Sequence, residues 1–310
     1  MAKIFFLGKK ILEIFLVLGM ASTVAITVHA KPDLKPLGKN IADTGSQVYN
    51  FQTKKFISKD QKRIYKVWLG IPKQKKNLST GSTAIFMLDG NSVMSRLNEH
   101  LLQGMAEQDA PVLVAIGYET NLPFDSKARS LDYTPADKTG ELAVDPRNPE
   151  RLSGGSKAFR KIIIQEIAPW VEQQVKLDPK RKILWGHSYG GLFVLDSLIA
   201  GQYFSHYFAA SPSLSWADQR IMKKLRSTKE PFAESKQLIL MEGDITPQKN
   251  QKVSPNFNKD MIVNNRELLS YVHSQGVSAK LIIYPELSHG EVFGASLKDI
   301  LMNKLDRKST

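Results

Sequence analysis

The sequence predicts a three-layer α/β fold, in which helices cover both faces of a mainly parallel twisted sheet. Short apolar runs alternate along the chain with longer amphipathic segments, and most of these runs are continuously apolar. Continuous apolar runs are typical of strands buried on both faces, and alternation with helices is typical of parallel sheets. The chain contains no cysteine, which excludes disulfides and thiolate metal sites.

The predicted elements follow one another in that alternating order. A polar–apolar alternation over 63–71 predicts an early, half-exposed strand. Further strands are expected at 82–88, 111–117, 182–185, 207–213, 237–241 and 279–284. Helices are expected at 93–105, 158–175, 191–200, 261–274 and 294–305. The helix over 158–175 should be interrupted near Pro169, because proline removes a helical hydrogen bond.

Residues 1–30 have the pattern of a secretory signal peptide. A basic start precedes an uncharged, mostly apolar run over 14–28, and Val28-His29-Ala30 offers small residues at the usual cleavage spacing. An uncleaved anchor is the alternative, and both predict export. A cysteine-free exported chain fits the periplasm of a bacterial envelope. Residues 31–48 are expected to form a linker, and 49–310 to form one α/β domain.

The segment 118–157 is long for a connection in a compact domain. It has little periodicity and is rich in Pro, Asp, Arg and Gly. Such segments are usually functional or disordered. It begins where a predicted strand ends, which is the edge at which open α/β sheets bind ligands. We therefore expect 118–157 to be a loop over a ligand site.

The most specific motif is Gly186-His-Ser-Tyr-Gly-Gly191, which fits G-x-S-x-G. It lies between an apolar strand candidate and a helix candidate, and that context predicts a nucleophile elbow in an α/β-hydrolase fold. The glycines are needed because the turn is strained and a nearby Cβ would clash. The elbow predicts Ser188 as a nucleophile and directs the Tyr189 N–H toward a developing oxyanion.

A serine nucleophile needs a base and a group that orients the base. In α/β-hydrolases the chain order is serine, acid, histidine. His289 lies just past the last predicted strand, whereas His273 lies within a predicted helix, so His289 is the predicted base. Asp244 follows the preceding strand and is the predicted acid. A Ser–His dyad is the alternative. Other carboxylates near these positions are Glu242, Glu286 and Glu291.

The oxyanion hole needs a second N–H from a loop after an earlier strand. Asp89-Gly90-Asn91 follows such a strand, and the N–H groups of Gly90 and Asn91 are its predicted donors. A purely structural turn is the alternative and needs the same glycine. His187 should point away from Ser188 and serve in packing or in supporting the residues that surround the nucleophile.

Several further motifs resemble the bacterial "putative esterase" branch of the α/β-hydrolases, which includes siderophore esterases. They are Gly154-Gly155-Ser, Phe159, Ile167-Ala-Pro-Trp170, Asp178, the elbow with Leu192-Phe193, and Ala210-Ser-Pro-Ser-Leu-Ser-Trp216. The segment from Gly117 to Asp125, continued by Arg129-Ser-Leu-Asp-Tyr-Thr-Pro135, is more specific. It resembles the periplasmic trilactone esterases that cut enterobactin-type and salmochelin-type siderophores. The resemblance covers most of residues 45–305.

The resemblance implies a serine esterase that hydrolyses the trilactone backbone of catecholate siderophores. Arg129 matches an arginine of the substrate-site loop, with an ion pair to Asp125 or Asp132 as the alternative. Phe124 and Trp216 are candidates to stack on substrate rings, with core packing as the alternative. The chemistry needs no metal and no organic cofactor.

The net charge of +13 favours an anionic partner such as a ferric catecholate. The basic residues are scattered and are not interleaved with aromatics, so nucleic acid is not an expected partner. Two other esterase functions share the fold and the triad: a short-acyl carboxylesterase and an S-acylglutathione thioesterase. A non-catalytic envelope binding protein is disfavoured because Ser188 and His289 are both present.

Overall fold

The protein is described by a computed structural model. It describes residues 35–74, 80–201, 203–228, 236–245 and 257–302. The predicted leader, residues 1–30, lies outside this part of the chain. Across the described ranges, no helix has both the length and the apolar character needed to cross a membrane.

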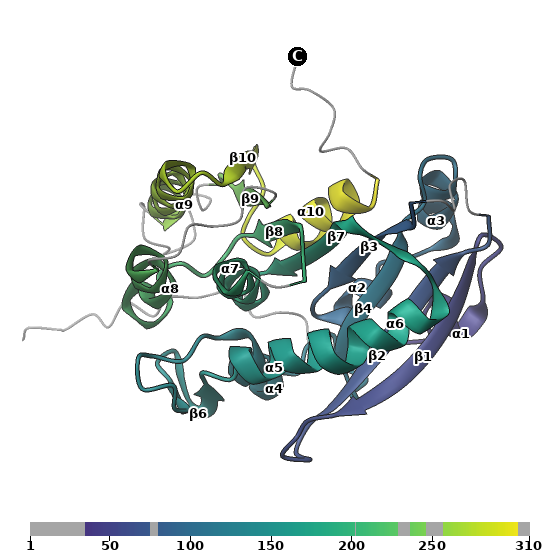
Figure 1. Cartoon of the computed structure of the whole chain (residues 1–310), viewed down its shortest axis with the longest axis horizontal. Coiled ribbons are helices and arrows are strands. Elements are labelled where there is room, and N and C mark those ends of the chain that lie inside the picture. Colours follow the sequence, from purple (N-terminus) through teal and green to yellow (C-terminus); the bar gives the residue numbers. More distant parts are fainter. Residues whose placement is uncertain (1–34, 75–79, 202, 229–235, 246–256, 303–310) are drawn as a thin grey trace, which may run out of the picture.

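An eight-stranded sheet forms the centre of the molecule (Figure 1). In spatial order its strands are β1 (Tyr49–Ile57), β2 (Ile64–Pro72), β4 (Val112–Tyr118), β3 (Ser82–Met87), β7 (Leu177–His187), β8 (His206–Ala210), β9 (Gln237–Gly243) and β10 (Ser278–Tyr284). The pairs β1–β2 and β2–β4 are antiparallel, and the other pairs are parallel. The strand order reverses at the β3–β7 pair. The carboxyl ends of strands at such a point are where open α/β sheets bind their ligands.

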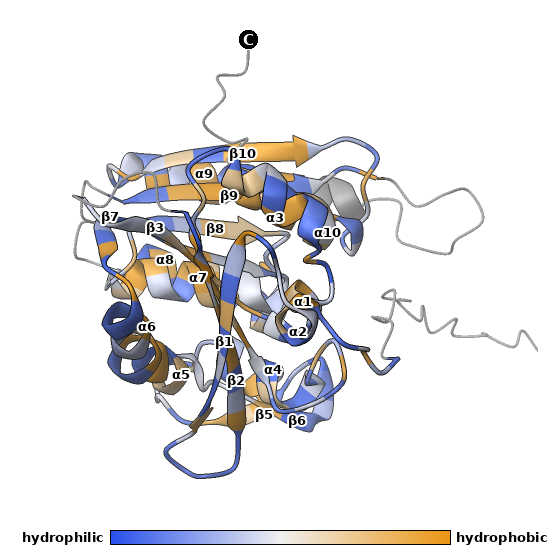
Figure 2. Ribbon diagram, turned by 90° about the vertical axis from the view of Figure 1, so that its right-hand side faces the viewer, coloured by the Kyte–Doolittle hydropathy of each residue, from blue (hydrophilic) through white to orange (hydrophobic). Residues whose placement is uncertain are grey.

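Helices cover both faces of the sheet, which confirms the three-layer prediction. One face is covered by α4 (Ser126–Tyr133), α5 (Ser156–Ile162), α6 (Ala168–Gln174), α7 (Tyr189–Ala200), α8 (Trp216–Ser227) and α9 (Phe257–Ser274). The other is covered by α1 (Ile41–Thr44), α2 (Gly90–Met94), α3 (Glu99–Ala106) and α10 (Glu291–Leu301). Hydrophobic residues follow β9 and α7, which are mostly buried, and also the edge strand β10 (Figure 2).

Central strands such as β4 are continuously apolar because their two faces enter two different cores. In β4, Val112, Val114 and Ile116 pack under the α7 layer, whereas Leu113 and Ala115 pack under the α10 layer. Successive side chains of a strand point to opposite faces, so both sets must be apolar.

The segment 118–157 is more regular than the predicted loop. It contains α4 and a hairpin of β5 (Ala143–Asp145) with β6 (Asn148–Ser153). The Asp125 carboxylate begins α4 by accepting hydrogen bonds from the N–H groups of Lys127 and Ala128. We call residues 118–157 the insert from here on.

Several elements differ from the prediction, and β1 and α8 were not predicted. The helix expected over 93–105 is two helices, α2 and α3. The interruption near Pro169 is a π-helical turn, Ile163–Ile167, after which proline stands in the first turn of α6. Within the expected linker, Asn40 caps the short helix α1, and the Leu37 N–H donates to the Asn121 carbonyl at 2.7 Å.

Candidate active site

Ser188 occupies a strained elbow between β7 and α7. Its backbone has φ 60° and ψ −113°, an arrangement that residues with side chains rarely adopt. A Cβ at Gly186 would lie 2.5 Å from the Gly190 carbonyl oxygen, and one at Gly191 would lie 2.8 Å from the Pro212 Cα. The glycines therefore allow the sharp turn that raises Ser188 above the carboxyl edge of the sheet.

The structure brings Ser188 and His289 together. His289 lies in the turn between β10 and α10, and its Nε2 is 3.1 Å from the Ser188 Oγ. Chain segments about a hundred residues apart thus place a hydroxyl within hydrogen-bond reach of an imidazole. This is the geometry that a serine nucleophile and its base require.

His187 holds the loop that carries His289. Its Nε2 is 2.7 Å from the His289 carbonyl oxygen, and the two rings lie 4.8 Å apart between centroids. Burial, together with the neighbouring His289, holds the pKa of His187 well below its usual value. The ring is therefore neutral, and because a carbonyl can only accept, Nε2 carries the donated proton. This positioning contact was not predicted from the sequence.

Asp244 also contacts the loop that carries His289. Its Oδ1 accepts a hydrogen bond from the Glu286 N–H at 2.6 Å, where the Glu286 backbone has a left-handed φ of 59°. Asp244 thus stabilises the turn that leads to His289. Its predicted function as the acid stays a prediction.

The other carboxylates around the base have structural contacts. Glu291 accepts hydrogen bonds from the N–H and the hydroxyl of Ser288, which lower its pKa. Glu242 is fully buried and accepts hydrogen bonds from the Ser211 hydroxyl at 2.7 Å and from the Asn265 amide at 3.0 Å. Burial raises the pKa of Glu242 to about 7.

Arg129 forms a bidentate ion pair with Asp89, and not with Asp125 or Asp132 as the sequence suggested. Both of its hydrogen bonds to the Asp89 carboxylate measure 2.9 Å, and its Nη2 also donates to the His187 carbonyl at 3.4 Å. Asp125 instead caps α4, and the Asp132 carboxylate pairs with the Arg63 guanidinium at 3.1 Å. Arg129 therefore joins the insert to the ends of β3 and β7.

The predicted oxyanion donors lie at the starts of two helices. Gly90 and Asn91 begin α2, and Tyr189 begins α7. The first N–H groups of a helix have no partner within that helix. The Asn91 side chain is committed to the end of β4: it accepts from the Tyr118 N–H at 2.9 Å and donates to the Tyr118 and Thr120 carbonyls at 3.0 and 2.8 Å.

The two aromatic candidates differ in their positions. Trp216 is 1% exposed, so its predicted stacking on substrate rings is wrong and the alternative of core packing is correct. Phe124 is half-buried, and it lies between the Arg129 guanidinium, 5.4 Å from its ring centroid, and the Phe293 ring at 5.9 Å. Phe124 therefore stays a candidate for substrate contact.

Asp145, which the sequence analysis did not single out, links the insert to the elbow. Its buried carboxylate accepts hydrogen bonds from the Tyr189 hydroxyl at 3.0 Å, the Trp216 indole at 3.0 Å and the Ser130 hydroxyl at 2.5 Å. The Arg147 N–H completes the set at 2.9 Å. No local pattern marks this residue, because its partners come from three separate segments of the chain.

Ser213 is a second polar neighbour of the nucleophile that sequence reasoning missed. It lies in the loop after β8, with its Oγ 3.1 Å from the Ser188 Oγ. It is 7% exposed. The segment 210–216 belongs to the resemblance described above, but a hydroxyl of this kind gives no sequence signal of its own.

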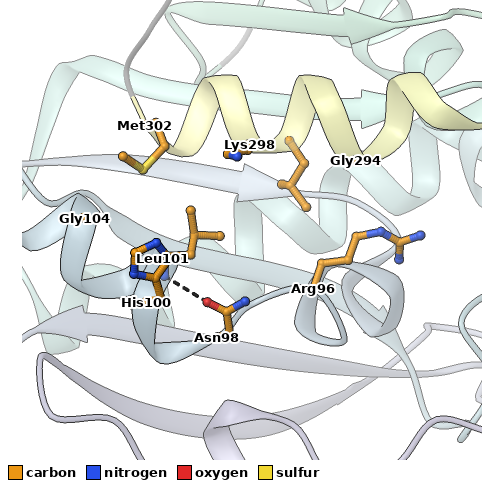
Figure 3. A pocket seen from close by; sticks show the side chains of 9 residues that line it. Arg96, Asn98, His100, Leu101, Gly104, Gly294, Lys298 and Met302 are labelled. Atoms are coloured by element: carbon orange, nitrogen blue, oxygen red, sulfur yellow. Dashed lines mark hydrogen bonds between the residues drawn. The ribbon is translucent and has the colours of Figure 1, made fainter. Parts of the chain in front are cut away.

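A groove of about 510 Å³ lies between α3 and α10 (Figure 3). Arg96, His100 and Lys298 line it together with the apolar Leu101 and Leu297. The Arg96 guanidinium also packs over the Phe293 ring at 4.6 Å, and Phe293 contacts His187. Among the side chains that the structure describes, no group of three or more His, Asp or Glu residues is placed to hold a metal ion.

Comparisons with known proteins identify the family of this chain. Residues 58–260 match the family model described as "Putative esterase". The chain is 41% identical over 276 residues to an apo-salmochelin esterase of Escherichia coli O6:H1 (strain CFT073), which covers 89% of this chain and 86% of the relative. It is 34% identical over 174 residues to the ferri-bacillibactin esterase BesA of Bacillus subtilis (strain 168), covering 54% and 60% of the two chains.

A solved structure agrees with this assignment. The structure described as enterobactin and salmochelin hydrolase IroE matches with a TM-score of 0.72 at 38% identity, over 85% of this chain and 98% of that one. A complex of that hydrolase with DFP matches to the same extent. The family match, the close relative and the shared fold lead to one conclusion: the chain belongs to the "Putative esterase" family.

Proposed function

We propose that this protein is a serine esterase that hydrolyses the trilactone backbone of catecholate siderophores. The observation that carries the proposal is the 3.1 Å contact between the Ser188 Oγ and the His289 Nε2 at a nucleophile elbow. The chain also shares 41% identity with an apo-salmochelin esterase.

The reaction proceeds in two steps. His289 takes the proton of Ser188 as the Ser188 Oγ bonds to a lactone carbonyl carbon, and the carbonyl π electrons move to the oxygen. The N–H groups of Tyr189, Gly90 and Asn91 stabilise that oxyanion. Collapse returns the proton from His289 to the departing seryl hydroxyl and leaves an ester on Ser188. Water activated by His289 then attacks this ester and frees Ser188.

The substrate class follows from the charge and the insert. A catecholate siderophore is anionic. The net charge of +13, which is +11 without residues 1–30, attracts such ligands, most strongly at low ionic strength. Phe124 offers an aromatic face that is half-exposed, and the Arg129 guanidinium lies beside it. We place the reaction in the periplasm, because residues 1–30 have the pattern of a cleaved leader.

Incubation with a cyclic tri-serine catecholate lactone, followed by mass spectrometry of the products, tests the proposal. The expected products are the linear trimer, which is one water heavier than the cyclic substrate, and shorter fragments. The summed mass of the products rises by one water for each bond cut. S188A is the control and should yield none. p-Nitrophenyl acetate and S-acylglutathione are offered in parallel. Turnover of these alone would assign a general carboxylesterase or a thioesterase instead.

Labelling with a fluorophosphonate tests the nucleophile separately. The reagent should modify Ser188 in the native chain and leave both S188A and heat-unfolded protein unmodified. A folded native chain that resists labelling would favour a non-catalytic envelope binding protein and overturn the assignment of Ser188.

A further inference from the structure

We propose that Ser213 is a further catalytic residue, whose hydroxyl donates a hydrogen bond to the Ser188 oxygen while that oxygen acts as the nucleophile. The inference rests on the proposed esterase function and extends it beyond the Ser188–His289 pair. The carrying observation is that the two hydroxyl oxygens lie 3.1 Å apart.

The direction of this hydrogen bond follows from the number of protons. Ser188 has one hydroxyl proton and gives it to the His289 Nε2, which lies 3.1 Å away and accepts it as the base. The Ser188 oxygen can then only accept from Ser213. Ser213 must therefore be the donor in the reactive arrangement.

The backbone that carries Ser213 is held in place before the reaction. The Ser213 N–H donates to the Ser188 carbonyl at 3.2 Å, and the Trp216 N–H donates to the Ser213 carbonyl at 2.9 Å. One residue earlier, Pro212 packs against Gly191, where a Cβ would come within 2.8 Å of the Pro212 Cα. Ser211 is bound to the buried Glu242. Fixed donors stabilise developing charge without the cost of reorienting.

The catalytic effect comes from the negative charge that develops transiently on the Ser188 oxygen during the attack. As the proton moves from the Ser188 Oγ to the His289 Nε2 and the bond from Oγ to the carbonyl carbon forms, negative charge develops on Oγ. Ser213 keeps its own proton throughout. Hydrogen bonds to charged groups are stronger than those to neutral groups, so its bond stabilises the transition state more than the resting enzyme.

The test compares S213A with S215A. Ser215 lies in the same loop, but it is exposed and its hydroxyl accepts from the Arg147 guanidinium at 2.9 Å, so it is a matched control. The readout is the rate constant of fluorophosphonate labelling per active site. S213A should slow it by about tenfold to a hundredfold, the loss expected for a donor to developing charge. S215A should match the native rate, and S213T, which restores the hydroxyl, should recover most of the loss.

The same measurement distinguishes a failure of this inference from a failure of the esterase proposal. A purely structural Ser213 would lower the number of labelled sites or the unfolding temperature while leaving the rate per site unchanged, and that result overturns the inference. S213C keeps the shape with a weak donor. Should S213A not fold, S213C must be slowed in the same way, and an unslowed S213C overturns the inference. A native chain that does not label at all overturns the esterase proposal instead.

Discussion

Replacing Asp145 with alanine should destabilise the whole protein, because this carboxylate satisfies three buried side-chain donors at once. The Ser130, Tyr189 and Trp216 side chains that donate to it are 0%, 7% and 1% exposed. In the alanine variant the Ser130 hydroxyl keeps its hydrogen bond to the Leu152 carbonyl at 3.0 Å. The Tyr189 and Trp216 donors would be left inside the fold with neither Asp145 nor bulk water as a partner.

The magnitude follows from the number of donors. A buried donor left without a partner costs about 1–3 kcal/mol. Two such costs in contact with one another do not add fully, so we expect D145A to lose about 2–5 kcal/mol of unfolding free energy. Since a domain is stable by about 5–15 kcal/mol in total, this loss brings the variant close to unfolding at room temperature.

Urea unfolding at pH 7 measures this loss, with W216F as a partner variant. W216F removes one of the three donors, so the double variant D145A/W216F should lose less than the sum of the two single losses. D137A, an exposed aspartate in the same insert, is the control and should leave the unfolding midpoint unchanged. A D145A loss below about 1 kcal/mol would refute the reasoning, since that is the smallest cost of even one unpaired donor.

The same carboxylate predicts a pH dependence. Burial raises the pKa of Asp145, but hydrogen bonds from Ser130, Arg147, Trp216 and Tyr189 outweigh burial and hold that pKa below its usual value. An acid with a lowered folded pKa stabilises the protein above its unfolded pKa of about 3.9, and this contribution disappears as the pH falls through the folded pKa. The stability difference between the native chain and D145A should therefore shrink below about pH 4.

Two further predictions concern the loops around the base. D244N should keep kcat within about tenfold of the native value, because its amide oxygen can still accept the Glu286 N–H; a loss of about a thousandfold or more would show that Asp244 is the orienting acid. Burial raises the folded pKa of Glu242 to about 7. A raised carboxyl pKa favours the folded state at low pH, so stability should fall by roughly 3 kcal/mol between about pH 4.3 and pH 7. E242Q should flatten that slope in urea unfolding series, and an unchanged slope would contradict the assignment to Glu242.

The elements that could be predicted are those in which burial of the side chains produces a local pattern in the sequence. β4 is apolar at every position because its two faces enter two cores. The edge strand β1 has mostly exposed side chains and a polar sequence, so it gave no such pattern and was missed. The helix α4 was missed for a related reason, since it is short and polar and depends on the Asp125 cap.

The residues of the candidate site also divide into those that a local sequence pattern marks and those that no such pattern marks. Ser188 is marked by the glycines that its turn requires, and His289 by its position after the last strand. The partners of Arg129 could not be found this way, because Asp125 and Asp132 are nearer in sequence than Asp89. Their carboxylates contact the start of α4 and Arg63 instead, which only the three-dimensional arrangement decides. Asp145 and Ser213 contact residues in distant segments of the chain. A contact between distant segments leaves no periodic pattern in the sequence.

The contacts of Arg129 and Asp145 give the insert a structural role beside the catalytic residues. An insert that only covered the pocket would affect substrate binding alone. Here it contacts the catalytic framework at two points: Arg129 binds Asp89 and the His187 carbonyl, and Asp145 binds the hydroxyl of Tyr189, whose N–H is a predicted oxyanion donor. Because the insert supports the elbow, a change in it that alters substrate preference without loss of catalysis should lie outside these two contacts. Phe124, half-buried beside Arg129, is such a residue, so exchanges there should alter KM for aromatic siderophores while leaving the labelling of Ser188 intact.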